Sequence, residues 1–266
     1  MDLLVVGGSG FLGREVVRQG LVAGARVVAT FHRRALPVAG VDWRALDVRD
    51  RGGVAALVER VRPAVVVNAA FRQADWVTTA DGGMHVAAAS VAVGARLVHV
   101  SSDAVFSARS GSYDELAAPA PATPYGAAKA AAETAVRGLD PAAVVARTSL
   151  IVGGGLSVHE TFVHSLAAGA TTGLLFTDDV RCPVHVGDLA AALLELAVSP
   201  YAGIHHLAGT DALSRHELGV LVAGRDDLPA GPRPQGPLDV RLDCTRTQSR
   251  LTTRLRGARE FLVSPG

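Results

Sequence analysis

Short apolar runs rich in β-branched residues recur along the first 150 residues. Five of them span 2–7, 25–31, 64–70, 95–101 and 143–149. They are continuous, not alternating, which is typical of strands that are buried on both faces of a parallel sheet. Segments of helical length and composition lie between them, at 11–23, 51–61, about 74–93 and 124–138. This alternation predicts an α/β fold with a Rossmann-type doubly wound parallel sheet.

The rhythm loosens after residue 150. Glycine-rich turns follow, and residues 227–239 are rich in proline and glycine, which predicts long loops. Residues 184–198 form a strongly apolar segment that we expect to be a helix packing back on the main sheet. We therefore expect a main domain over 1–150, to which 175–200 return, and a smaller C-terminal lobe over 151–266.

Charge and cysteine content exclude several classes of protein. The chain has 26 basic and 25 acidic residues and a net charge of +1, so no overall field attracts nucleic acid or an anionic membrane. No apolar run approaches the roughly 20 residues of a membrane span, and the N-terminus shows no export signal. Cys182 and Cys244 have no metal-ligand spacing, which fits a reducing compartment. We expect a cytoplasmic protein without a bound metal.

The stretch VVGGSGFLG lies between the first predicted strand and the first predicted helix. It contains the pattern G-x-x-G-x-x-G, in which glycines permit a tight turn and let the backbone approach a pyrophosphate at a helix N-terminus. The pattern predicts that a dinucleotide cofactor contacts Gly7, Gly10, Phe11, Leu12 and Gly13. We accordingly expect the main domain to bind NAD(P) and the lobe to bind the substrate.

The end of the second predicted strand indicates which cofactor is bound. It reads TFHRR, with Arg33 and Arg34 and no carboxylate for the ribose hydroxyls. Guanidinium groups suit a 2′-phosphate, so NADP(H) is preferred and NAD(H) stays an alternative, as does a solvated loop. Further cofactor contacts are predicted at the following strand ends, from Asp47, Val48, Asn68, Ala69 and Ala70.

The stretch TPYGAAK places a tyrosine and a lysine on one helix face. Thr123 can cap the helix and Pro124 suits its first turn, so Tyr125 and Lys129 are separated by one turn. The lysine, together with a positive nicotinamide ring, is expected to lower the pKa of the phenol. Ser102 ends the fourth predicted strand, where sheets of this type bind ligands. Tyr125 and Lys129 are also expected to touch the cofactor.

These motifs together resemble an extended short-chain dehydrogenase/reductase, specifically the dTDP-4-dehydrorhamnose reductase family of nucleotide-sugar reductases. The resemblance covers most of the chain, including GGSGFLG, GARLVHVSSDAVFS, TPYGAAKAAAE and RCPVHVGDLA. It implies that Ser102 takes the catalytic Ser/Thr position, Tyr125 is the acid and Lys129 its partner, with Asp103 following the hydroxyl residue. It also implies NADP-dependent reduction of a keto group on a nucleotide-activated deoxysugar.

The chain departs from this family at two positions. Ala104 stands where the family has a substrate-side tyrosine, and 77–86 contain no asparagine of the catalytic tetrad. Two alternatives therefore stay open, namely a non-catalytic NAD(P)-binding regulatory or sensor protein and a nucleotide-sugar epimerase or dehydratase. The expected partner is a small molecule, a nucleotide sugar, and an oligomer is left open.

Several other histidines and arginines are set aside. His159 and His164 are too widely spaced for the zinc motif H-E-x-x-H, and the adjacent His205 and His206 are expected to be structural. Three arginines recur at 246, 250 and 254 and would form a solvated basic stripe if helical. By resemblance alone, Arg181 and His185 are candidate pocket residues.

Overall fold

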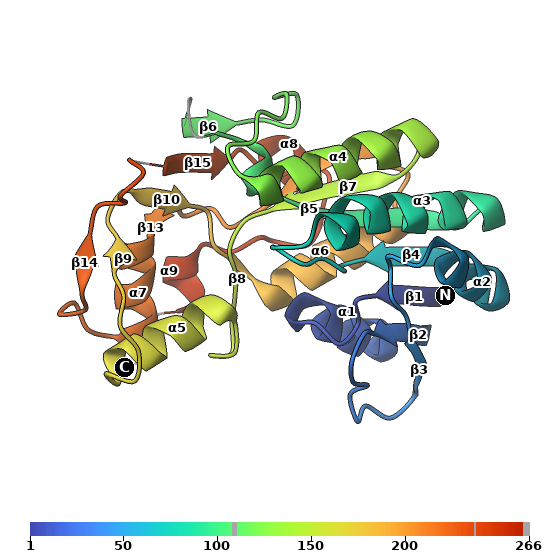
Figure 1. The fold of residues 1–266 in the computed structure, drawn as a ribbon, viewed down its shortest axis with the longest axis horizontal. Coiled ribbons are helices and arrows are strands. Elements are labelled where there is room, and N and C mark those ends of the chain that lie inside the picture. Colours follow the sequence, from blue (N-terminus) through green and yellow to red (C-terminus); the bar gives the residue numbers. More distant parts are fainter. Residues whose placement is uncertain (108–110, 237, 263–266) are drawn as a thin grey trace.

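The structure is a computed structural model that describes residues 1–107, 111–236 and 238–262. Its centre is a parallel sheet of seven strands in the order β12-β7-β5-β4-β1-β2-β3 (Figure 1). The strands are β1 (Asp2–Val6), β2 (Arg26–Phe31), β3 (Val41–Ala45), β4 (Val65–Asn68), β5 (Arg96–Ser102), β7 (Val144–Thr148) and β12 (Gly203–Leu207). The reversal of strand order at β1 creates a crevice at the carboxyl ends of β1 and β4. The predicted α/β fold is confirmed.

All five predicted strands are present, whereas β3 and β12 were not predicted. Strand β3 lies at the sheet edge and is largely exposed, so its sequence VDWRA lacks a continuous apolar run. Strand β12 reads GIHHL. Its two adjacent histidines interrupt the apolar pattern, although both side chains are buried and the strand pairs with β7.

Helices cover both faces of this sheet (Figure 1). One layer consists of α2 (Arg51–Val61), α3 (Gly82–Val93) and α4 (Pro124–Leu139), and the other of α1 (Phe11–Val22) and α6 (Val186–Val198). A separate apolar core fills each interface, as expected for strands without a polar face. The predicted helix at 74–93 begins as a π-helical turn over Val77–Asp81 before α3.

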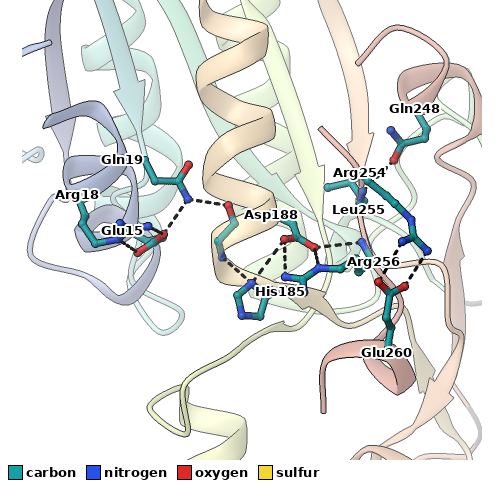
Figure 2. Close-up of polar contacts among 11 residues, drawn as sticks. Glu15, Arg18, Gln19, His185, Asp188, Gln248, Arg254, Leu255, Arg256 and Glu260 are labelled. Atoms are coloured by element: carbon teal, nitrogen blue, oxygen red, sulfur yellow. Dashed lines mark hydrogen bonds and ion pairs between the residues drawn. The ribbon is translucent and has the colours of Figure 1, made fainter. Parts of the chain in front are cut away.

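The apolar segment at 184–198 contains α6, which packs on the main sheet. Polar contacts fix its first turn between α1 and the C-terminal segment (Figure 2). The Gln19 amide of α1 donates to the Gly187 carbonyl at 2.8 Å, and the Asp188 carboxylate accepts from the backbone and guanidinium of Arg256. These contacts connect the segment around Arg256 with α6 and, through α6, with the main sheet. The division of the chain near residue 150 stays a prediction.

The smaller lobe is built from short elements at the carboxyl end of the main sheet (Figure 1). A four-stranded sheet combines β13 (Leu213–Ser214), β10 (Asp179–Arg181), β15 (Leu238–Leu242) and β6 (Gly111–Tyr113). Two strand pairs accompany it: β11 (Val184–His185) with β8 (Ile151–Val152), and β14 (Ala230–Gly231) with β9 (Leu175–Phe176). The helices are α5 (Val158–Ala167), α7 (Arg215–Ala223), α8 (Thr245–Gln248) and α9 (Ala258–Phe261).

Among the described residues, two of the four lobe helices begin at side-chain caps. Ser157 with Glu160 and Ser214 with Glu217 form capping boxes at α5 and α7. Helix α8 covers only four residues, so Arg246, Arg250 and Arg254 do not share one helix face. Within the described ranges, no helix has both the length and the apolar character needed to cross a membrane.

Candidate active site

The glycine turn joins β1 to α1 and packs tightly against the end of β4. Gly7 has a positive φ of 82°, and a Cβ there would lie 2.8 Å from the Ala70 nitrogen. A Cβ on Gly13 would overlap the Gly7 carbonyl oxygen. Both positions therefore require glycine, because a side chain would clash at either one and Gly7 also has a positive φ. The result is an open cradle in front of the N-terminus of α1.

A cavity of 530 Å³ opens beside this turn at the carboxyl ends of β1, β2 and β4. Its lining includes eight predicted cofactor residues: Gly7, Gly10, Arg33, Arg34, Asp47, Val48, Ala69 and Ala70. Its remaining lining residues are Ser9, Thr30, Phe31, His32, Leu36, Leu46, Arg49, Phe71, Arg72 and Thr78. The other predicted cofactor residues, Phe11, Leu12, Gly13, Asn68, Tyr125 and Lys129, lie outside it. Arg49 and Arg72 add positive charge that the sequence analysis missed.

The charges of this cavity favour an anionic ligand. Asp47 forms an ion pair with Arg49 at 2.6 Å, and hydrogen bonds from Arg49 lower the pKa of the Asp47 carboxyl to about 2. Arg33 and Arg34 form no ion pair with another described residue and are exposed. The glycine turn and these two guanidinium groups without ion-pair partners therefore fit a dinucleotide that carries a 2′-phosphate.

The side chains of Asn68 and Leu12 do not line the cavity but pack behind it. The Asn68 side chain is buried, 3.2 Å from His99 Nδ1, and its oxygen accepts from the Ala70 nitrogen. Leu12 is part of the core between α1 and the sheet. Their side chains thus pack within the protein and fix the backbone that lines the cavity.

Tyr125 and Ser102 meet at the carboxyl end of β5. As predicted, the Thr123 side chain caps α4 by accepting from Gly126, and Pro124 occupies the first turn. Burial raises the pKa of the Tyr125 phenol to about 12, a hydrogen bond with Ser102 lowers it, and the Asp103 carboxylate raises it. The phenol pKa is thus raised where a lowering was expected, because burial outweighs the hydrogen bond. The phenol is neutral at physiological pH and carries a proton to donate.

Lys129 is buried one turn further along α4. Its Nζ donates to the Val100 carbonyl at 2.9 Å and lies 5.2 Å from the centre of the Phe71 ring. Burial lowers the pKa of this ammonium to about 8, and Glu133 acts in the opposite direction. The Phe71 ring also lies 5.9 Å from the Tyr125 ring. Phe71 thus lies beside both the tyrosine and the lysine and also lines the cofactor cavity, which the sequence did not indicate.

Asp103 is predicted as catalytic, but its carboxylate is buried and fully engaged. One oxygen accepts from Ser102 Oγ at 3.2 Å, and the other accepts from Ser149 Oγ at 2.7 Å and lies 3.0 Å from Arg181 Nη1. The Ser102 oxygen in turn accepts from the backbone nitrogen of Ala104. Asp103 therefore contacts the site through the Ser102 hydroxyl.

A second cavity of 430 Å³ lies in the smaller lobe between α5, α7 and β9. Three polar residues, His159, Asp179 and Arg215, are set among seven apolar ones, Val158, Phe162, Val163, Leu174, Leu175, Phe176 and Leu218. His159 Nδ1 faces Arg215 Nη1 at 3.3 Å, and burial with this cation lowers the pKa of His159 to about 4. A cation at this distance does not suit a zinc ligand.

The fold and the site define an α/β dinucleotide-binding protein with a tyrosine, serine and lysine at the carboxyl edge of its sheet. The model of the RmlD substrate binding domain matches residues 1–253, and the chain belongs to this family. It is 33% identical to a dTDP-4-dehydrorhamnose reductase of Streptomyces griseus, over 78% of this chain and 70% of that protein.

Two further similarities extend over more of the chain. It is 28% identical to the methionine adenosyltransferase 2 subunit beta of Xenopus laevis, over 92% of this chain and 81% of that protein. The structure also resembles dTDP-4-dehydrorhamnose reductase from Bacillus anthracis, determined in complex with NADP. That likeness has a TM-score of 0.85 at 22% identity and covers 98% of this chain and 97% of the other.

Proposed function

We propose that the protein is an NADP-dependent reductase of a keto group on a nucleotide-activated deoxysugar. The observation that carries this proposal is the placement of Tyr125 and Lys129 one turn apart on α4, with the Tyr125 phenol near enough to Ser102 at the end of β5 for that hydroxyl to lower its pKa. A phenol with a transferable proton beside a second hydroxyl is what protonation of a carbonyl oxygen requires.

The glycine cradle and the 530 Å³ cavity would hold the cofactor, which supplies a hydride when bound. Arg33 and Arg34 would bind the 2′-phosphate by charge-assisted hydrogen bonds. The relative of known structure in complex with NADP supports this choice, while relatives in complex with NAD keep NAD(H) as a second cofactor.

The chain's own residues would handle the proton and the developing charge. Tyr125 donates its proton to the carbonyl oxygen, and the Ser102 hydroxyl orients that oxygen by a hydrogen bond. Lys129 places its ammonium beside Phe71, and its positive charge would stabilise the phenolate that proton donation leaves. The nucleotide sugar is supported by family membership and by relatives named dTDP-4-dehydrorhamnose reductase.

The test is NADPH oxidation with a dTDP-4-keto-6-deoxyhexose generated in situ, compared with NADH. We expect turnover that prefers NADPH and that falls by roughly a hundredfold or more in Tyr125→Phe, because the proton donor is lost. Tyr201→Phe is the matched control, since this tyrosine packs against Arg250 and His205. Absence of turnover with tight NADPH binding would contradict the proposal.

A second candidate is a non-catalytic, cofactor-binding regulatory protein. It is favoured by the similarity to a relative named as a subunit of methionine adenosyltransferase 2, which covers 92% of this chain. This candidate predicts cofactor binding that is unaffected by Tyr125→Phe, together with no oxidation of NADPH by wild-type protein on any keto sugar.

A further inference from the structure

A row of buried charges connects the Ser102 hydroxyl with the cavity of the smaller lobe. Arg181 bridges Asp103 at 3.0 Å and Asp179 at 2.9 Å, and Asp179 also pairs with Arg215 at 3.1 Å. Asp179 and Arg181 are two apart in β10 and therefore lie on the same face of the strand. The row ends at Arg215, which lines the lobe cavity.

The distances within this row show how firmly each partner holds Asp103. Ser149 Oγ is 2.7 Å and Arg181 Nη1 3.0 Å from one carboxylate oxygen, whereas Ser102 Oγ is 3.2 Å from the other. An O–H···O bond of 3.2 Å is long and weak. The charge of Asp103 is thus compensated mainly by Arg181, so the Ser102 hydroxyl can turn from Asp103 toward a substrate oxygen.

Loss of Arg181 would change this balance. The Asp103 carboxylate is buried, and without its cation it would hold the Ser102 proton more tightly. Its negative charge would also oppose phenolate formation at Tyr125 more strongly. Both effects would leave Ser102 and Tyr125 less able to act on a carbonyl oxygen.

We infer that Arg181 and Arg215 are positioning residues that control the Ser102 hydroxyl through Asp103 and Asp179, and that this row couples occupancy of the lobe cavity to the reacting hydroxyls. The inference rests on the proposed function for its catalytic meaning, but the coupling itself does not. A group bound in the cavity would contact Arg215 and Asp179. It would thereby change the ion pair between Asp179 and Arg181.

The coupling can be measured without turnover. The chain has three tyrosines, so protein labelled with ¹³C at tyrosine Cζ gives three resonances. The resonance that is lost in Tyr125→Phe is that of Tyr125. This carbon reports the hydrogen bonding of its own hydroxyl. Arg181→Met is expected to shift the Tyr125 resonance and to leave those of Tyr113 and Tyr201 in place.

Further variants separate this coupling from a general loss of structure. Arg181→Lys should restore most of the wild-type shift, and Arg215→Met should produce a smaller shift in the same direction. Arg256→Met is the control, because it breaks an ion pair of 2.8 Å at the start of α6 that is not part of this row. If Arg181→Met does not fold, Arg181→Lys and Arg215→Met carry the test.

Kinetics give the second readout. For Arg181→Met we expect kcat to fall by roughly tenfold to a hundredfold, the effect of one hydrogen bond to a charged group, with the KM for NADPH unchanged. An unshifted Tyr125 resonance in Arg181→Met and Arg215→Met would overturn the inference, whatever the rates. If the Tyr125 resonance shifts in these variants but the wild-type protein oxidises no NADPH, the coupling is upheld and the proposed reductase function is contradicted instead.

Discussion

The buried ion pair between Glu133 of α4 and Arg147 of β7 gives the sharpest prediction on stability. The Arg147 side chain is 0% exposed and that of Glu133 3% exposed, and they approach to 2.8 Å. Arg147 binds both carboxylate oxygens through Nε and Nη2, while Ser101 donates to the same carboxylate. No solvent can compensate either charge if its partner is removed.

Glu133→Gln keeps the shape of the side chain and removes its charge. The guanidinium of Arg147 would then remain buried without a counter-ion, which costs about 3–5 kcal/mol of unfolding free energy. The double variant Glu133→Gln/Arg147→Met should regain most of this loss, because it leaves no unpaired guanidinium. Recovery should be incomplete, since Arg147 also lies 5.0 Å above the Phe106 ring, a contact of about 0.5–2 kcal/mol.

Urea unfolding at pH 7, followed by circular dichroism, measures these differences. Arg254→Gln is the control, because its pair with Glu260 is exposed and should contribute little. The reasoning would be refuted if Glu133→Gln lost no more stability than Arg254→Gln, or if the double variant were no more stable than Glu133→Gln.

Three further predictions concern the cofactor and Lys129. Replacing Arg33 and Arg34 together by alanine should raise the KM for NADPH by roughly tenfold to a hundredfold, because charge-assisted hydrogen bonds to the 2′-phosphate are lost. The KM for NADH should stay unchanged. An equal effect on both cofactors would contradict this prediction. Gly13→Ala should abolish NADPH binding in a titration of its fluorescence, since its Cβ would overlap a loop carbonyl, whereas Gly138→Ala has open space and should bind normally. Burial lowers the pKa of Lys129 from 10.5 to about 8, so the unfolded state binds more protons than the folded state between these two pH values. The free energy of unfolding should therefore rise with pH over this interval by up to about 3 kcal/mol relative to Lys129→Met. Parallel pH profiles of the two proteins would contradict the prediction.

The sequence predicted those parts of the fold whose signals are local. Continuous apolar runs mark strands that are covered on both faces, and the cap at Thr123 marks the start of α4. Strand β3 escaped because an exposed edge strand needs no such run. Strand β12 escaped because its two histidines are buried, and burial of a polar side chain depends on partners that lie far away in the chain, such as Thr247.

The same distinction holds for the candidate site. The glycine turn and the pair Tyr125 and Lys129 follow from spacing, since their partners lie within one loop or one helical turn. The contacts of Asp103 with Ser149 and Arg181 join three separate strand ends or loops, and no pattern along the chain signals them. The raised pKa of Tyr125 was missed for a related reason, because desolvation depends on everything that packs around the phenol.

The reductase and the regulatory interpretation differ in what they expect of the buried charges. Both interpretations require the glycine cradle and the cavity that holds a cofactor, but only a reductase needs the Lys129 ammonium, whose burial lowers its pKa to about 8, for a reaction at Tyr125. Side chains that oppose folding persist where they serve a reaction. Lys129 should therefore be replaceable by methionine with a gain in stability at neutral pH in either case, and only in a reductase should that gain be accompanied by a loss of turnover.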